Sequence, residues 1–105
     1  MENKSKAETF IGFAIRAGKF RSGTNTLATL KKAHLIIVCG TAAENTCKTA
    51  LKYAAKYRCK VFRTCGAELA GIAHKDGIKI AAITDFSLAK AIIDNSAPYL
   101  TEYSE

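Results

Sequence analysis

Hydrophobic residues recur along this chain with two patterns, and the change between them separates helices from strands. Apolar positions three or four residues apart lie on one face of a helix, whereas a short unbroken apolar run is typical of a buried strand. The helical spacing predicts one helix that ends at Gly18, one that opens at Gly23 and ends at Lys31 and Lys32, one from Thr41 to about Tyr57, a short one over 66–73, and a last one that begins at Thr84 and Asp85.

The strand segments are short and rich in β-branched residues. The segment 34–39 is a continuous run bounded by Gly40, which is typical of a strand covered on both faces. We expect further strands over 19–21, 60–63 and 78–83. Helices and strands therefore alternate, which predicts a three-layer α/β/α sandwich with a small, mixed four-stranded sheet.

Three helix starts carry polar residues that can cap the first turn. Ser5 with Glu8, and Thr41 with Glu44, have the spacing of a capping box, in which side chains satisfy amides that the helix leaves free. Asp85 is a further capping residue. The segment 40–46 follows a buried strand, where α/β folds often bind phosphate. It lacks the Walker lysine and the spaced glycines, so plain helix capping explains it better.

The length of 105 residues suits one domain with a single core. We expect the domain to span 1–105, with its core over about 5–95 and a flexible, loosely held tail after Ser96. No apolar run approaches the roughly 18 residues of a membrane helix, and the polar stretch 1–6 lacks the apolar core of a signal peptide. The expected location is cytoplasmic, without a membrane partner. The sequence leaves the oligomeric state open, with a monomer favoured.

Basic residues outnumber acidic ones. Sixteen Lys and Arg against nine Asp and Glu give a net charge of +7 and a pI of about 9.4. Such an excess attracts polyanions, which favours nucleic acid as a partner, while a balance that serves solubility alone is the alternative. Lys48, Lys52 and Lys56 fit that alternative, because a lysine every fourth residue is typical of a solvated helix face. Tyr53 and Tyr57 are expected to pack along the edge of the core.

No catalytic or metal-binding set assembles in the sequence. Seven, eleven and five residues separate the cysteines Cys39, Cys47, Cys59 and Cys65, which matches no paired CxxC site. We expect thiols that pack as small hydrophobes, with Cys65 in a loop. His34 and His74 have no partner at the spacing of a triad or a metal pair. The expectation is a protein that is not an enzyme and holds no metal and no cofactor.

The most informative segment is 18–26, which sets small hydrogen-bonding residues between basic ones where a helix begins. Arg21 offers a fork for phosphate, Gly23 lets a ligand approach the backbone, and Asn25 offers a donor and an acceptor to a base edge. The first-turn amides add donors that favour anions. A helix that simply starts at a glycine, without any ligand, is an equal alternative on these residues alone.

Five motifs give the chain a wider resemblance. They are Gly12-Phe13-Ala14-Ile15-Arg16-Ala17-Gly18-Lys19, Ser22-Gly23, Leu35-Ile36-Ile37-Val38, Ala43-Glu44-Asn45-Thr46 and Ala81-Ala82-Ile83-Thr84-Asp85. As a set, in order over roughly residues 8–93, they resemble the kink-turn RNA-binding family of ribosomal proteins L-seven-Ae and L-thirty-e, above all its bacterial YlxQ-like branch. The resemblance implies an α/β/α sandwich that binds structured RNA, in particular ribosomal RNA, within a ribonucleoprotein.

The resemblance also implies which residues contact RNA. In that family the helix after a Gly-x-Asn-Glu type motif enters the major groove at the sheared G·A pairs of a kink-turn, and a loop beyond the third strand holds an extruded nucleotide. The corresponding positions here are Gly23, Thr24, Asn25 and Thr26 at the helix start and Arg63, Thr64, Cys65 and Gly66 in the loop. Arg21, Lys31 and Lys32 would supply nearby phosphate contacts.

Two positions depart from the family's pattern. Thr26 stands where its kink-turn binders often have Glu, and Thr29 stands where they have Lys. The expected function is non-enzymatic binding of structured RNA, a kink-turn or a related ribosomal RNA motif, through the helix start and the loop. The alternative is a protein-interaction module that keeps the fold and has lost kink-turn recognition.

Overall fold

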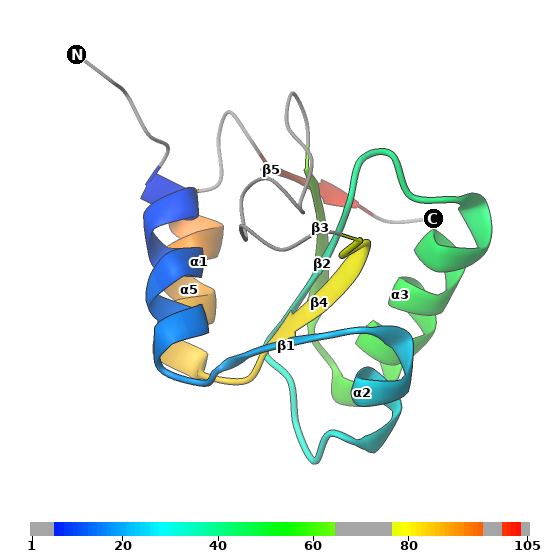
Figure 1. Ribbon diagram of the computed structural model, residues 1–105, viewed down its shortest axis with the longest axis horizontal. Coiled ribbons are helices and arrows are strands. Elements are labelled where there is room, and N and C mark those ends of the chain that lie inside the picture. The colour runs from blue at the N-terminus through cyan, green and yellow to red at the C-terminus, as the bar shows by residue number, and fades with distance from the viewer. Residues whose placement is uncertain (1–5, 65–76, 96–99, 104–105) are drawn as a thin grey trace.

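The computed structural model describes residues 6–64, 77–95 and 100–103. Within them the chain forms the helices α1 (Lys6–Arg16), α2 (Thr24–Thr29), α3 (Glu44–Tyr57) and α5 (Phe86–Asp94) and the strands β1 (Phe20–Ser22), β2 (Leu35–Val38), β3 (Lys60–Thr64), β4 (Ile80–Ile83) and β5 (Leu100–Tyr103), as Figure 1 shows. The predicted helix over 66–73 and the predicted cap residue Ser5 lie outside the described residues. None of the described helices is long and apolar enough to span a membrane.

The strands form one mixed sheet in the order β1-β4-β2-β3-β5. β2 and β3 are parallel, with Leu35 opposite Lys60, and β4 is antiparallel to β2, with Ile83 opposite Leu35. The residues Leu35, Lys60 and Ile83 therefore lie at one end of the sheet, which we call the Leu35 end. Val38 and Ile80 lie opposite each other at the other end, the Val38 end.

The sheet has five strands, where the sequence predicted four. β5 lies antiparallel to β3, with Leu100 opposite Thr64 and Tyr103 opposite Val61. Leu100 is 2% exposed. The expectation of a loosely held tail after Ser96 is therefore wrong for residues 100–103. The segment carries no apolar run because only Leu100 and Tyr103 are turned away from solvent, so pairing with β3 determines this strand more than its own pattern.

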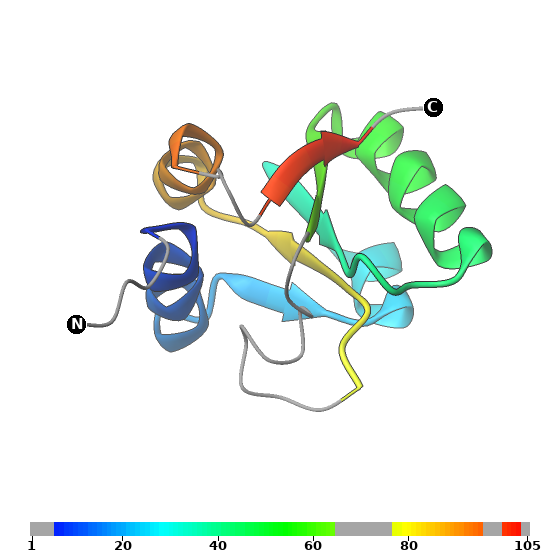
Figure 2. The ribbon, with the colours of Figure 1, turned by 90° about the horizontal axis from the view of Figure 1, so that it is seen from above.

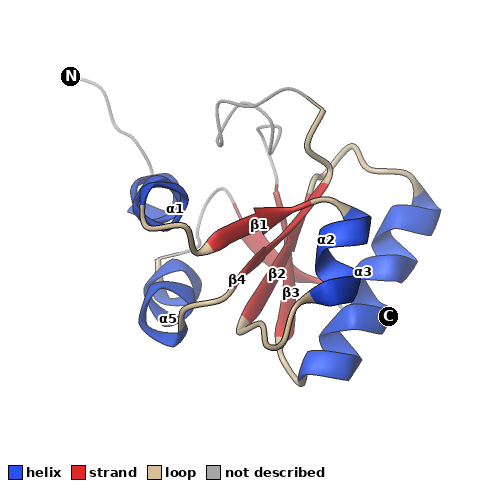
Figure 3. Cartoon of the chain, turned by 60° about the horizontal axis from the view of Figure 1, so that its bottom comes forward, coloured by secondary structure: helices blue, strands red, loops and turns tan. Residues whose placement is uncertain are grey.

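Helices cover both faces of the sheet, which confirms the predicted three-layer α/β/α sandwich. α1 and α5 lie together on one face, while α2 and α3 lie on the other (Figure 2, Figure 3). Successive residues of β2 serve the two faces in turn: Leu35 and Ile37 join the core under α1 and α5, and Ile36 and Val38 join the core under α2 and α3. All four are buried, as the unbroken apolar run predicted.

The caps of α3 and α5 differ in how well the sequence predicted them. Asp85 caps α5 as predicted, since its Oδ2 accepts a hydrogen bond from the Leu88 amide at 2.8 Å. α3 has Ala43 as its N-cap and no side-chain cap, so the predicted Thr41 capping box is wrong. The Thr41 hydroxyl instead lies 3.1 Å from Cys39 Sγ and accepts from Lys79 Nζ at 3.1 Å.

α2 ends at Thr29, before the predicted end at Lys31 and Lys32. Side chains occupy the carbonyls of its last turn: Tyr57 contacts those of Leu27 and Leu30, Lys56 that of Ala28, and Thr29 that of Thr26. The Tyr57 hydroxyl lies 2.6 Å from the Leu27 oxygen and 2.9 Å from the Leu30 oxygen. Tyr53 and Tyr57 also pack against the core, as predicted. α3 therefore holds the end of α2 in place.

Candidate nucleic-acid interface

α2 begins in a backbone conformation that glycine adopts readily and other residues do not. Gly23 has φ 99° and ψ 143°, a region that is unfavourable for a residue with a Cβ. Its amide donates to the Ile80 carbonyl at 3.1 Å, and its carbonyl accepts from the Leu27 amide at 3.0 Å. Gly23 therefore fixes the first turn of α2 to β4 at the Val38 end of the sheet.

The first turn of α2 is open to solvent. Thr24 and Asn25 are exposed, Thr26 is half-buried, and no side chain caps the helix. The Asn25 side chain makes no hydrogen bond to any other residue that the structure describes. Its amide group is therefore available to offer both a donor and an acceptor, and the predicted contact with a base edge stays a prediction.

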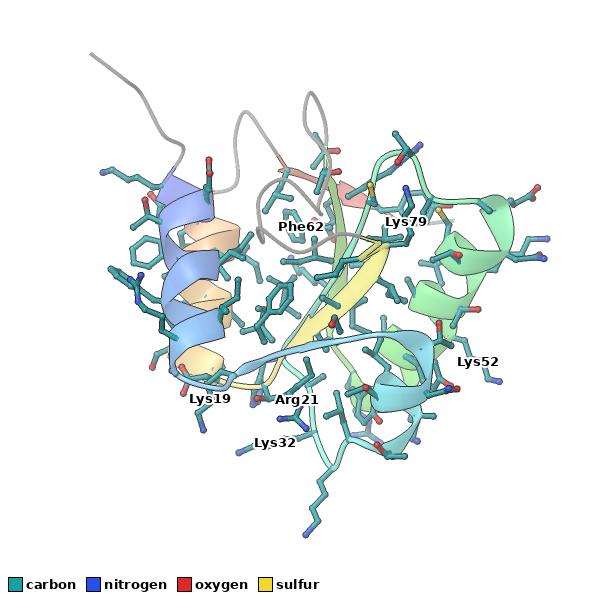
Figure 4. All side chains as sticks on the ribbon, in the orientation of Figure 1. Lys19, Arg21, Lys32, Lys52, Phe62 and Lys79 are labelled. Atoms are coloured by element: carbon teal, nitrogen blue, oxygen red, sulfur yellow. The ribbon has the colours of Figure 1, made fainter. Side chains whose placement is uncertain are left out.

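The basic residues expected beside this turn lie in β1 and in the segment that follows α2. Arg21 is exposed in the middle of β1, opposite Ala82, on the face of the sheet that α2 covers. Lys31 and Lys32 are exposed in the segment after α2, which returns the chain to the Leu35 end of the sheet. In Figure 4, Lys19, Arg21 and Lys32 all lie along the lower side of the molecule. We call these three residues the β1 strip.

Lys79 is a cation at the Val38 end that sequence reasoning missed. It directly precedes Ile80, whose carbonyl holds the Gly23 amide. Its own carbonyl accepts from the Cys39 amide at 2.8 Å, and its Nζ reaches Thr41 Oγ1. The exposed side chain thus lies by the end of β2 and the turn before α3, at the upper right of Figure 4. Only the antiparallel pairing of β4 brings Lys79 there, and no hydrophobic pattern reveals strand order.

Two of the four loop residues expected to clamp RNA are described. Thr64 is 3% exposed, and its hydroxyl accepts from the Gly40 amide at 2.7 Å. A Cβ on Gly40 would collide with the Thr64 carbonyl, so β2 and β3 end in close contact. Thr64 therefore serves the packing of the strand ends, and its contact with RNA stays a prediction. Cys65 and Gly66 lie outside the described residues.

Arg63 is exposed but already held within the protein. Its Nη2 donates to the Gly40 carbonyl at 2.9 Å, and its guanidinium lies over the Tyr103 ring, 5.8 Å from the ring centroid. A guanidinium carries five N–H donors in a fixed plane. Arg63 can therefore keep both contacts and still turn donors toward a phosphate, and its contact with RNA stays a prediction.

The remaining chemistry-bearing residues do not extend the site. No group of three or more His, Cys, Asp or Glu side chains within the described residues could hold a metal ion. Cys39 and Cys47 are buried in the two cores, and Cys59 is half-buried. Burial raises the pKa of the Cys59 thiol from 9.0 to about 11. These three thiols pack as small hydrophobes, as the sequence predicted.

Comparisons with known proteins bear on the fold. No family model and no curated protein matches the chain. The chain is similar to the solved structure of a protein of unknown function from Bacillus halodurans C, with a TM-score of 0.77 and 18% sequence identity. The match covers 87% of this chain and 96% of that chain. A likeness at this identity supports the α/β/α sandwich and is silent on activity.

Proposed function

We propose that the protein binds structured RNA without catalysing a reaction, and that the open start of α2 reads the RNA. The observation that carries the proposal is the position of Asn25. Its side chain is exposed and has no partner among the described residues, and the turn beneath it is hydrogen-bonded to the sheet through Gly23. A side chain that pairs with the edge of a nucleobase must be held in place by the backbone turn that carries it.

The charge of the molecule supports a polyanionic partner. The net charge is +7, and exposed cations lie at both ends of α2. Lys79 and Arg63 lie at the Val38 end with the helix start, and the β1 strip continues from Arg21 toward the Leu35 end. Each phosphate that such cations neutralise releases counterions, which gives affinity without sequence preference. Asn25 then supplies the base contact that phosphate binding lacks.

The RNA class follows from the resemblance and from the two threonines that depart from it. The Thr29 hydroxyl donates to the Thr26 carbonyl at 3.0 Å, so Thr29 supports the end of the short helix and offers no cation to a phosphate. We therefore propose a kink-turn or a related ribosomal RNA motif, bound in a cytoplasmic ribonucleoprotein, with the missing cation replaced by Arg21 or Lys79.

Asn25→Ala tests this proposal. The variant should lose about 1–3 kcal/mol of binding free energy for the RNA motif, because a bidentate base contact is worth that much. The measurement is fluorescence anisotropy with a kink-turn RNA and an unrelated hairpin of equal length, each at two salt concentrations. Asn45→Ala is the matched control, since Asn45 is the exposed second residue of α3 as Asn25 is of α2.

The two RNAs separate the outcomes. Tighter binding of the kink-turn RNA at both salt concentrations, lost in Asn25→Ala and kept in Asn45→Ala, supports the proposal. Equal affinities of the wild type and Asn25→Ala would remove the start of α2 from the interface.

A protein-interaction module is the second candidate function. The observation that favours it is the exposure of two apolar side chains of α1, since Phe13 is 43% exposed and Ile15 is 37% exposed. Neither side chain belongs to the core under α1 and α5. Absence of binding to both RNAs at low salt would favour this function over the first.

A further inference from the structure

A cavity of about 450 Å³ lies at the Leu35 end of the sheet. Its walls come from His34 just before β2, the turn between α3 and β3, and α5. Because β1 ends and α2 begins at the Val38 end, the cavity and the start of α2 are at opposite ends of the sheet. Its volume is within the range of small-molecule sites, which is about 300–1,000 Å³.

One wall of the cavity carries an aromatic ring that the fold does not use. Phe86, the first residue of α5, is 63% exposed. The His34 and Phe86 rings form a T-shaped pair, with centroids 5.7 Å apart and planes at 80°. The Asp85 cap fixes the start of α5, and a hydrogen bond of 2.8 Å from the His34 amide to the Ile83 carbonyl fixes His34. A held, exposed ring of this kind offers its face to another flat ring.

The other walls carry more positive than negative charge. Arg58, Lys60 and Lys90 line the cavity, against Asp94 as the acid. Lys90 pairs with Asp94 at 3.2 Å, and Lys60 pairs with Glu102 at 3.8 Å, all of them well exposed. Arg58 forms no ion pair within the part of the chain that the structure describes. The cavity therefore favours an anion, and Arg58 is the cation most open to it.

Arg58 occupies a backbone position that usually belongs to glycine. It is the C-cap of α3 in the left-handed conformation, with φ 59° and ψ 47°, and its amide donates to the Ala54 carbonyl. A residue with a Cβ is disfavoured there, and glycine is the common choice. Arginine therefore occupies a position where glycine would relieve backbone strain, and its side chain lines the cavity.

We propose that this cavity binds a nucleoside phosphate, with the base against Phe86 beside His34 and the phosphate against Arg58 and Lys60. An uncharged aromatic ligand would make no use of the basic residues that line the cavity. Inorganic phosphate would make no use of the Phe86 ring. The same chemistry is presented by a free nucleotide and by one nucleotide of a single-stranded RNA segment. The site is separate from the start of α2, so the inference goes beyond the proposed function and does not rest on it.

The first experiment follows backbone amide signals by NMR during titration with adenosine monophosphate, adenosine and inorganic phosphate. We expect the monophosphate to shift the amides of Cys59, Lys60 and Phe86 and to bind more tightly than either fragment. Absence of shifts at these amides with millimolar monophosphate would overturn the proposal. Equal affinity for the monophosphate and for inorganic phosphate would contradict the proposed contact between the nucleobase and the Phe86 ring.

Two variants test the named contacts without removing core packing. Phe86→Ala should weaken binding of the monophosphate about tenfold, because stacking on one aromatic ring has roughly that effect. Arg58→Gly should weaken it by a similar factor and at the same time raise the urea midpoint of unfolding, because glycine suits the left-handed position. Unchanged affinity in both variants contradicts the proposal. Lys48→Ala is the control for charge, since Lys48 lies ten residues before Arg58, about 15 Å along α3.

A short single-stranded oligoadenylate distinguishes the two sources of the ligand. If it binds more tightly than the monophosphate and Phe86→Ala weakens it, the cavity takes a segment of RNA. If the monophosphate binds more tightly, the ligand is a free nucleotide. The amides of Cys59, Lys60 and Phe86 report on the cavity, at the opposite end of the sheet from Gly23 and Asn25, so a failure at this cavity is distinguishable from a failure at the start of α2.

Discussion

Gly23 and Gly12 differ in whether the fold requires glycine at their positions. Gly23 joins β1 to α2 with φ 99°, a conformation that a Cβ disfavours. Gly12 lies inside α1, where an added Cβ would meet nothing within 4 Å among the described residues beyond its chain neighbours and the backbone of its own helix. The sequence alone pointed to Gly23 because it stands before a helical pattern, whereas its positive φ and the hydrogen bond of its amide to Ile80 are features of the folded chain.

Gly23→Ala should destabilise the fold by about 1–3 kcal/mol, the range for a strained backbone position. Gly12→Ala should instead stabilise it by about 0.5–1 kcal/mol, because glycine is a poor helix residue. Urea unfolding of the two variants measures both signs. An unchanged free energy of unfolding in Gly23→Ala would mean that the start of α2 adapts to a Cβ without strain. The turn that carries Asn25 would then not be held in place as proposed.

Cys59 makes stability depend on alkaline pH. Its folded-state pKa of about 11 lies above the reference value of 9.0, because burial disfavours the thiolate. A raised pKa contributes stability that is fully present below the unfolded pKa and is lost as the pH rises through the folded pKa. The free energy of unfolding of the wild type should therefore fall, relative to that of Cys59→Ala, between about pH 9 and about pH 11. An equal pH dependence of the two proteins would contradict a protonated, half-buried thiol.

At the scale of elements, the hydrophobic and capping patterns predicted those helices and strands that are determined by residues near one another in the sequence. β2 followed from its unbroken apolar run, and the α5 cap followed from Asp85. β5 and the end of α2 did not follow, because partners distant in the chain decide them. Leu100 pairs with Thr64, and the carbonyls at the end of α2 are occupied by Tyr57 and Lys56 of α3.

Tyr57→Phe should destabilise the fold by about 0.5–1.5 kcal/mol, the net contribution of a typical hydrogen bond. The hydroxyl that it removes lies 2.6 Å from the Leu27 carbonyl. Tyr53→Phe is the matched control, since Tyr53 stacks on Tyr57 at 6.4 Å and its hydroxyl has no hydrogen-bond partner among the described residues. Chemical unfolding of both variants measures the difference. Equal stability would show that the end of α2 does not need α3.

At the scale of the whole molecule, the candidate site is more extended than its residues suggested. Asn25, Arg63 and Lys79 lie at the Val38 end, while Lys32 belongs to the return segment near the Leu35 end. The sequence identified Asn25 and Lys32 from a short local stretch. The sequence also placed them at the two ends of one predicted helix, whereas the arrival of Lys79 from a distant segment depends on strand order, which one chain's pattern does not contain.

Lys32→Ala should weaken binding of every RNA alike and flatten the plot of log affinity against log salt by about one unit, as loss of one phosphate contact does. This result requires the RNA to extend from the start of α2 along the β1 strip. Lys48→Ala is the control of equal charge, because Lys48 pairs with Glu44 at 3.5 Å on α3. A salt slope that Lys32→Ala leaves intact would confine the RNA to the Val38 end.

β5 closes one edge of the sheet. It covers the outer edge of β3, whose backbone groups would otherwise be free to pair with another chain, and Val61 and Phe62 make that strand apolar. β5 itself is a poorer template, because it is short and directs Thr101 and Glu102 to solvent. In a shortened chain that ended at residue 95, the outer edge of β3 would be open to pairing with another chain, and we expect that variant to aggregate more readily.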